Sequence, residues 1–302
     1  GTGPKKEDMM DIQTFIHPYL QIYTKCFLIR TDHCNVWIDT GLRGGWDSVQ
    51  FACLTNGRRN AALLTHGHWD HIGGVNRIRR GGGLVYGNEA DRRELTEPDW
   101  QWLWQFGQLS GDFELPPARK EVFYDSIEPP MNLDYTVTDG DVLTFDGLRF
   151  RVIAVPGHSA GSVCYLEESS GTLFTGDAIM GSGFFAGTPQ ISDFEAYDHS
   201  MERVKGLCVS RVFTAHTDPV NGRDLPRLAQ ASQDCAVRMR RAVEIYVNST
   251  DGPVTVRDAA RAIARTEGKN VGGGTCVSAL AALWQMDDPR AKACASGYIC
   301  GT

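Results

Sequence analysis

The sequence predicts an α/β fold in which two strand-rich halves, with helices outside them, occupy residues 10–222 and a helical tail follows. Two observations lead to this prediction. Short runs of β-branched and aromatic residues alternate with turn signals and amphipathic stretches through the first part of the chain. Beyond this part only helical patterns remain, over residues 225–247, 256–266 and 276–286.

The individual elements follow from short apolar runs that end at turn residues. Strands are expected at residues 20–30, 35–39, 61–65, 84–86, 141–145, 148–155, 162–167, 172–175 and 211–214. The dipeptide Asp146-Gly147 predicts a hairpin turn between two of these strands. Helices are expected at residues 72–79, 89–95 and 194–207, and Asn88 and Asp193 are suited to cap the last two.

Residues 98–130 show no clean period and are rich in Trp, Phe, Gly and Pro. Connections this long inside a domain are usually functional or mobile. Within the insert, Trp100, Trp102 and Trp104 stand at alternate positions. An extended chain would place all three on one face. A helix would instead place Trp100 and Trp104 on one face and turn Trp102 elsewhere.

Length and charge limit the classes of protein that the chain can belong to. Its 302 residues suffice for one large domain, or for a main domain with an appendage. We expect a cloning remnant and disordered N-terminus over residues 1–10, a catalytic domain over 11–222 and a helical extension over 223–302. The net charge of −7 without a long basic run argues against a nucleic-acid partner.

The compartment is inferred from what the sequence lacks. No apolar run approaches the roughly 18 residues that cross a bilayer, so no membrane partner is expected. The first eight residues contain no apolar core of a secretory signal. The nine cysteines are odd in number and scattered, which favours reduced thiols over a disulfide framework. We therefore expect a cytoplasmic protein.

One segment concentrates groups that bind metals. Residues 65–71 contain three histidines and an aspartate, directly after an expected strand. Neutral imidazole and carboxylate are ligands that suit zinc and other borderline divalent ions. His158, Asp177 and His216 each lie just past the end of a further strand, where a rigid sheet can aim them. These residues include five of the eight histidines in the chain, so a shared metal site is predicted.

These residues resemble the metallo-β-lactamase superfamily over roughly residues 12–220. Its motifs stand here as Asp39, His66-x-His68-x-Asp70-His71, His158, Asp177 and His216. The resemblance implies a four-layer αββα sandwich with a C-terminal helical extension. It also implies a first metal held by His66, His68 and His158, a second held by Asp70, His71 and His216, and Asp177 bridging the two. Asp39 would support the metal loop, residues 66–71, from behind. A turn-capping role is equally compatible with its position two residues before Gly41.

The implied cofactors are two divalent ions, with zinc as the default and iron or manganese acceptable to the same ligands. Two metals about 3.5 Å apart can share one hydroxide and lower its pKa towards neutrality. The resemblance implies that this hydroxide attacks the carbonyl of an acyl thioester or activated ester. Asp70 or Asp177 would orient the attacking oxygen and relay a proton.

The ligand set narrows the choice among members of the superfamily. True β-lactamases of this fold usually lack the bridging aspartate, and the oxygen-reducing di-iron members carry glutamate in place of His68. Quorum lactonases usually carry a tyrosine shortly after the bridging aspartate, where this chain has residues 178–181 without one. The basic cluster by which glyoxalase II binds glutathione is not recognisable in the tail.

We therefore favour hydrolysis of an acyl thioester or activated ester. A lactone hydrolase, an iron-dependent sulfur dioxygenase, a phosphodiesterase and a metal-binding regulatory protein remain alternatives. The tryptophans of the insert, together with Phe184 and Phe185 in a loop after the bridging aspartate, suggest an apolar or aromatic acyl pocket under a partly mobile lid. The expected partner is a small acyl substrate, and a homodimer is left open. Core packing is the competing interpretation of the tryptophan stripe.

Overall fold

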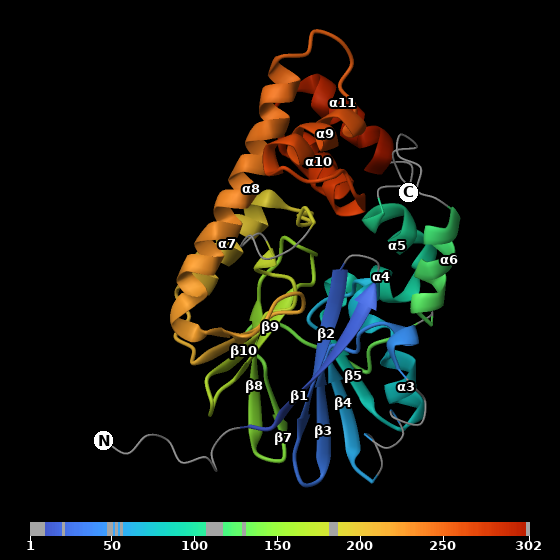
Figure 1. The fold of residues 1–302 in the computed structure, drawn as a ribbon, viewed down its shortest axis with the longest axis vertical. Helices are drawn as coiled ribbons and strands as arrows, with labels where there is room; N and C mark the ends of the chain where they lie inside the picture. The colour runs from blue at the N-terminus through green and yellow to red at the C-terminus, as the bar shows by residue number, and fades with distance from the viewer. Residues whose placement is uncertain are drawn as a thin grey trace.

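In the computed structural model, the described residues form two six-stranded sheets that face each other, and helices cover the outer side of each (Figure 1). The structure describes residues 10–19, 22–46, 51, 54, 57–106, 117–128, 131–180 and 187–299. This arrangement confirms the four-layer α/β sandwich, in which each sheet buries one face against the other sheet and one against helices.

The first sheet has the strand order β1-β2-β3-β4-β5-β6. Its strands are β1 (Ile12–Tyr19), β2 (Ile22–Arg30), β3 (Cys34–Ile38), β4 (Arg59–Leu63), β5 (Leu84–Gly87) and β6 (Tyr135–Thr136). The first three pair antiparallel, whereas β3, β4, β5 and β6 pair parallel. Because β3 and β4 run in the same direction, the loops that follow them emerge at the same edge of the sheet.

The second sheet has the order β12-β11-β10-β9-β8-β7. Its strands are β7 (Val142–Phe145), β8 (Leu148–Ala154), β9 (Val163–Glu167), β10 (Thr172–Phe174), β11 (Arg211–Phe213) and β12 (Val220–Asn221). The predicted hairpin joins β7 and β8, with φ of 46° at Asp146 and 91° at Gly147. Two positive φ angles in a two-residue loop match the right-handed twist of the flanking strands. The strands β10 and β11 are parallel, so their following loops also share one edge.

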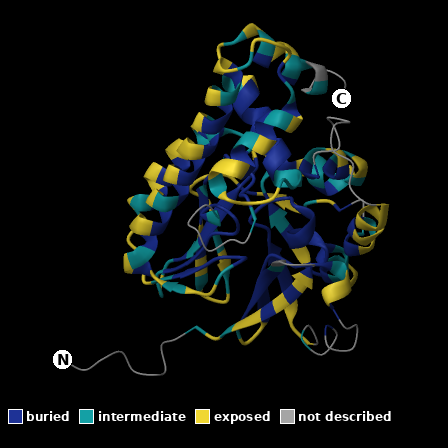
Figure 2. Cartoon of the chain, turned by 45° about the horizontal axis from the view of Figure 1, so that its top comes forward, coloured by how far each residue is buried: buried dark blue, intermediate teal, exposed yellow. Residues whose placement is uncertain are grey.

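Aromatic and aliphatic side chains fill the space between the sheets. Phe27 of β2 lies 5.5 Å from Phe174 and 5.3 Å from Phe213 between ring centroids, which joins the first sheet to the second. Figure 2 shows buried residues concentrated in the strands and exposed ones on the outer sides of the helices. The apolar area removed from water here is the main favourable contribution to folding.

Short helices cover the first sheet. They are η1 (Arg43–Gly45), α2 (Trp69–Ile72), α3 (Val75–Arg80), η2 (Glu89–Asp91), α4 (Arg92–Thr96), α5 (Pro98–Gln105) and α6 (Pro117–Ser126). The sequence predicted one helix over residues 72–79, but the helix is interrupted at Gly73. A Cβ atom there would lie 2.3 Å from the amide nitrogen of Arg43 and 2.5 Å from the carbonyl oxygen of Ser126. Two neighbouring segments therefore approach the backbone too closely for a side chain.

The tryptophan stripe lies on a helix, α5, where the sequence showed no clean period. Trp100 and Trp104 stack with their ring centroids 5.4 Å apart, on the face away from Trp102. Trp102 is 6% exposed and packs against Phe106 and Phe123. The helix carries apolar residues on both faces, so no period of 3.6 stands out in its eight residues.

The remaining helices cover the second sheet and extend beyond it. They are α7 (Phe194–Lys205), η5 (Gly222–Asp224), α8 (Leu225–Asn248), α9 (Val256–Glu267), α10 (Gly273–Gln285) and α11 (Pro289–Ile299). The sequence predicted all of these α-helices except α11. The Asp193 carboxylate accepts hydrogen bonds from the amides of Glu195 and Ala196, which confirms it as the cap of α7.

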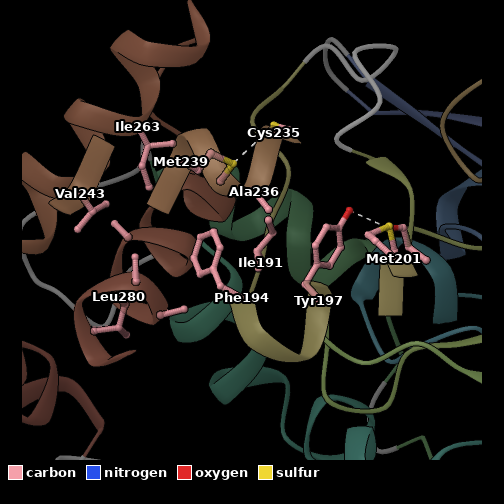
Figure 3. Close-up of a cluster of buried hydrophobic side chains, with 14 of the residues drawn as sticks. Ile191, Phe194, Tyr197, Met201, Cys235, Ala236, Met239, Val243, Ile263 and Leu280 are labelled. Atoms are coloured by element: carbon pink, nitrogen blue, oxygen red, sulfur yellow. Dashed lines mark hydrogen bonds between the residues drawn. The ribbon is translucent and has the colours of Figure 1, made fainter. Parts of the chain in front are cut away.

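The helical tail shares one core with α7. Figure 3 shows Phe194 and Tyr197 of α7 among side chains from the tail, including Met239 of α8, Ile263 of α9 and Leu280 of α10. The tail also touches the tryptophan insert, because α10 packs against α5. Within the described residues, no helix is both long and apolar enough to cross a membrane.

The burial of Trp102 predicts a large loss of stability when its side chain is removed. Replacing this buried indole with alanine leaves a cavity beside Phe123, so Trp102→Ala should lower the free energy of unfolding by about 3–5 kcal/mol. Chemical denaturation measures the change. Leu103→Ala on the exposed side of the same helix is the control and should change it by about 0.5 kcal/mol or less. Equal losses in both variants would contradict the burial of Trp102.

Candidate metal centre

All seven side chains predicted to hold metals lie together at one edge of the sandwich, and each is at most 8% exposed. His66 and His68 follow β4, Asp70 and His71 lie in α2, His158 follows β8, Asp177 follows β10 and His216 follows β11. Both sheets thus contribute, because their strand ends meet at this edge. The described residues include three overlapping groups of these side chains whose ligand atoms lie within 4.8 Å of one another.

The first group consists of His66, His68 and His158. The Nε2 atom of His158 lies 3.3 Å from Nε2 of His66 and 2.9 Å from Nδ1 of His68. Nitrogens bound about 2.1 Å from one zinc ion in a tetrahedron lie about 3.4 Å apart. The spacing of the three imidazoles is therefore close to that of a single-ion site.

The second group consists of Asp70, His71 and His216. Asp70 Oδ2 lies 3.6 Å from His71 Nε2 and 3.7 Å from His216 Nε2. Asp177 stands between the groups. One of its carboxylate oxygens lies 3.4 Å from His71 Nε2, and the other lies 3.2 Å from His216 and 3.5 Å from His158. A single carboxylate therefore reaches both groups.

Asp39, predicted to support the metal loop, lies directly behind it. Its carboxylate accepts hydrogen bonds from the amide and the hydroxyl of Thr65, both at 2.8 Å, and lies 2.9 Å from His71 Nδ1. The Thr65 hydroxyl also lies 3.0 Å from His66 Nδ1. A proton on the outer nitrogen of each imidazole leaves the inner nitrogen free to bind a metal, which is the usual arrangement around ligating histidines.

Other oxygen atoms orient the remaining imidazoles. The backbone carbonyl of Gln190 lies 2.9 Å from His158 Nδ1, and that of Tyr23 lies 2.5 Å from His216 Nδ1. The Gln190 side-chain amide lies 3.2 Å from His68 Nε2. The nearer amide atom is the nitrogen, Nε2; turning the amide by 180° would bring its oxygen to the ring, where it would accept the proton of His68 Nε2 and leave His68 Nδ1 free. Sequence reasoning did not identify Gln190, which belongs to no motif.

Burial determines the charge of the three imidazoles of the first group, His66, His68 and His158. Desolvation, reinforced by the other histidines, lowers the pKa of His66 and His68 well below its ordinary value. Burial also lowers the pKa of His158. These rings are therefore neutral at physiological pH, as metal ligands must be.

Two atoms in the cluster have no hydrogen-bond partner among the described residues: His71 Nε2 and Asp177 Oδ1, both buried. An unsatisfied buried polar atom costs about 1–3 kcal/mol, and more for a charged group. Both atoms belong to the side chains that face the interior of the cluster. A cation would satisfy them, and imidazole with carboxylate is a suitable ligand set, so the residues present fit a metal centre.

A buried carboxylate that sequence reasoning missed joins the two loops of the first group. Asp91 of η2 accepts hydrogen bonds from the amide of Gly67 at 2.9 Å, the hydroxyl of Ser159 at 2.7 Å and the amide of Gly161 at 2.6 Å. Gly67 lies between His66 and His68, and Ser159 follows His158. Asp91 therefore fixes the distance between the two loops, although its local sequence carries no sign of this role.

A cavity of about 410 Å³ opens beside His68 and His158. Its walls are Glu94 of α4, Trp100 and Trp104 of α5, residues 156–160, and the start of α7. Two of the three tryptophans predicted to contact substrate thus line a cavity at the cluster. Trp102 does not, because it packs into the core. Phe184 and Phe185 lie outside the described residues.

Fold and cluster define a protein of the four-layer α/β-sandwich class whose histidine and aspartate side chains can hold metal ions. A sequence model of the metallo-beta-lactamase superfamily matches residues 21–216, and the chain belongs to this superfamily.

Relatives with assigned names match part of the chain. It is 25% identical over 187 residues to an atrochrysone carboxyl ACP thioesterase of Aspergillus fumigatus, covering 61% of this chain and 47% of the relative. It is 28% identical over 159 residues to a hydroxyacylglutathione hydrolase of Ectopseudomonas mendocina, covering 51% and 46%. The chain thus spans about half the length of these curated relatives. A metallo-beta-lactamase family protein of Thermus thermophilus has a similar fold, with a TM-score of 0.71 at 21% identity over 90% of this chain and 91% of the other.

The hydrogen bonds of Asp91 predict that its removal lowers the affinity for metal. Asp91→Ala leaves the amide of Gly67 without its acceptor and loosens the His66–His68 loop. The affinity for zinc, measured by competition with a chromophoric chelator, should fall by about 10- to 100-fold. Glu89→Ala in the same turn removes only an exposed ion pair with Arg92 and should leave the affinity unchanged. A folded Asp91→Ala protein with native affinity would contradict this role.

Proposed function

We propose that the chain is a metal-dependent hydrolase that cleaves acyl thioesters or activated esters. The observation that carries this proposal is the position of Asp177. One of its carboxylate oxygens lies close to the His158 and His216 rings, and the other lies close to the His71 ring. In this proposal His66, His68 and His158 would hold one ion, Asp70, His71 and His216 would hold the second, and Asp177 would serve both.

Two divalent ions, zinc by default, would supply Lewis acidity and a hydroxide nucleophile at neutral pH. The protein side chains would then have separate tasks. Asp70 and Asp177 are the carboxylates that face the cluster, and either can accept a proton from the attacking water and pass it to the leaving group. Asp39 does not contact the substrate. It acts through its hydrogen bonds to Thr65 and His71, which hold the His71 ring in place.

The acyl preference is inferred from residues near Asp177 and from the relatives. The chain has Ala178, Ile179 and Met180 after this aspartate, where a lactonase would carry a tyrosine. The thioesterase named among the relatives supports a thioester substrate. The cavity lined by Trp100 and Trp104 offers an apolar surface for the acyl group. We further propose that residues 11–222 form the catalytic domain and that the helical extension closes one side of it.

A substrate panel on protein with counted metals tests the proposal. We expect about two divalent ions per chain, thioesters cleaved faster than lactones, and β-lactams barely cleaved. Asp177→Asn should bind fewer ions and lose at least about 100-fold in kcat, because it removes a charged ligand shared by both sites.

The same panel can reject the proposal. Lactones preferred by roughly tenfold or more in kcat/KM, about 1.4 kcal/mol of transition-state stabilisation, would reverse the ranking of substrates. One iron per chain with oxygen consumption would assign a dioxygenase instead. Asp125→Asn on the exposed side of α6 is a matched control and should retain full activity.

A further inference from the structure

The cavity beside His68 is lined by two acidic groups that the proposed chemistry does not use, Glu94 and Asp193. Glu94 of α4 lines the cavity, and its Oε2 atom is buried without a hydrogen-bond partner in the described part of the chain. A buried carboxyl oxygen without a donor is unfavourable, because it has lost its hydrogen bonds to water. A ligand that donates a hydrogen bond would remove this cost.

Among the described residues no lysine or arginine forms a salt bridge with Glu94, and the charge of the adjacent Arg93 opposes the rise of its pKa only in part. The adjacent Arg93 pairs with Glu97 at 2.9 Å, and its guanidinium lies 3.7 Å from the ring centroid of Trp100. Burial, reinforced by the carboxylate of Asp91, raises the pKa of Glu94 to about 7. The side chain therefore exchanges between carboxylate and carboxylic acid near neutral pH.

The wall next to Glu94 is apolar and held in place. The indoles of Trp100 and Trp104 are nearly parallel, with 13° between their planes, and Arg93 covers Trp100. The Gln101 side-chain amide donates to the backbone carbonyl of Glu94 at 2.6 Å and to that of Gly67 at 3.3 Å. Because Gly67 lies in the metal loop, this glutamine fixes the indole wall relative to the cluster.

The charge of the lining limits what can enter. Among the described residues that line the cavity there is no lysine or arginine, and the acidic groups are Glu94 and Asp193. Asp193 already accepts hydrogen bonds from two amides of α7 and from the Gln285 side chain. At the end of the cavity away from the histidines, an anionic substituent would thus meet the carboxyl groups of Glu94 and Asp193, whereas a hydrogen-bond donor would find Glu94 available.

We infer that this cavity binds an acyl group with an apolar body and a hydrogen-bond-donating substituent, a hydroxyl or an ammonium, and that Glu94 receives the donor. Glu94 is then a specificity-determining residue that discriminates against acyl groups ending in a carboxylate. This inference rests on the proposed hydrolase function and defines the substrate class of the same site.

Four thioesters test the inference on the metal-loaded protein. They are 3-phenylpropionyl thioesters of N-acetylcysteamine, with the ring unsubstituted or bearing a hydroxyl, an aminomethyl or a carboxyl group. We expect a kcat/KM at least about tenfold higher for the hydroxyl or aminomethyl substrate than for the carboxyl one, mostly through KM. A preference for hydroxyl alone identifies a neutral donor, and a preference for aminomethyl alone identifies a cation.

Two variants of Glu94 separate hydrogen bonding from charge. Glu94→Leu removes the acceptor and should bring all substituted substrates to within about threefold of the unsubstituted one. Glu94→Gln keeps an acceptor but no charge, so any hydroxyl preference should persist while discrimination between aminomethyl and carboxyl disappears. Glu121→Gln, an exposed residue of α6, is the control and should match the wild type. If Glu94→Leu does not fold, the Gln variant decides by the aminomethyl-to-carboxyl ratio.

Binding of uncleavable thioether analogues separates failure of this inference from failure of the proposed function. Calorimetry on the metal-loaded protein reports their affinities without any turnover. The expected order of affinities in a protein that cleaves no thioester would overturn the proposed function but support the ligand class. Equal affinities for all four analogues, unchanged in both Glu94 variants, would overturn the inference even if hydrolysis is found.

Discussion

Three hydrogen bonds converge on the buried carboxylate of Asp39, and the metal cluster depends on them. The donors are the amide and hydroxyl of Thr65 and the outer nitrogen of His71. Asp39 adopts a left-handed backbone conformation, with φ of 57°. Such a conformation is unfavourable for a residue with a side chain and persists only where its surroundings hold it. The three donors supply that restraint and tie the end of β3 to the loop after β4.

A second set of contacts links the cluster to the helical tail. The Ser278 hydroxyl of α10 accepts a hydrogen bond from the amide of Ile191 at 2.9 Å and donates to the carbonyl of Pro189 at 3.2 Å. Between these two residues lies Gln190, which contacts both His68 and His158. The tail is therefore part of the structure that positions the first group of histidines, and it is more than an outer layer on the sandwich.

Asp91 and Glu94 show how the surroundings give two acids of one short segment different properties. Asp91 receives three hydrogen bonds and holds two loops together, so its lone pairs are engaged within the protein. Glu94 faces the cavity, and its buried oxygen has no donor among the described residues. Burial without a partner disfavours the charged form of a carboxyl group. One acid is thus structural, and the other is available to a ligand.

The sequence by itself determined the two strand-rich halves, the helical tail and the positions of the cluster residues, because each depends on a local signal, whereas the four-layer sandwich was implied by the family resemblance. The histidine motif and its later members all follow short apolar runs, and strand ends are where a sheet directs side chains. Only the tertiary structure decided which groups surround the cluster. Gln190 lies 122 positions from His68, and Asp91 lies 68 positions from Ser159. Contacts over such separations leave no periodic pattern in the sequence, because they arise when distant loops pack together. The insert helix α5 was only one of two alternatives for a related reason, since its two faces are both apolar and pack against different parts of the molecule.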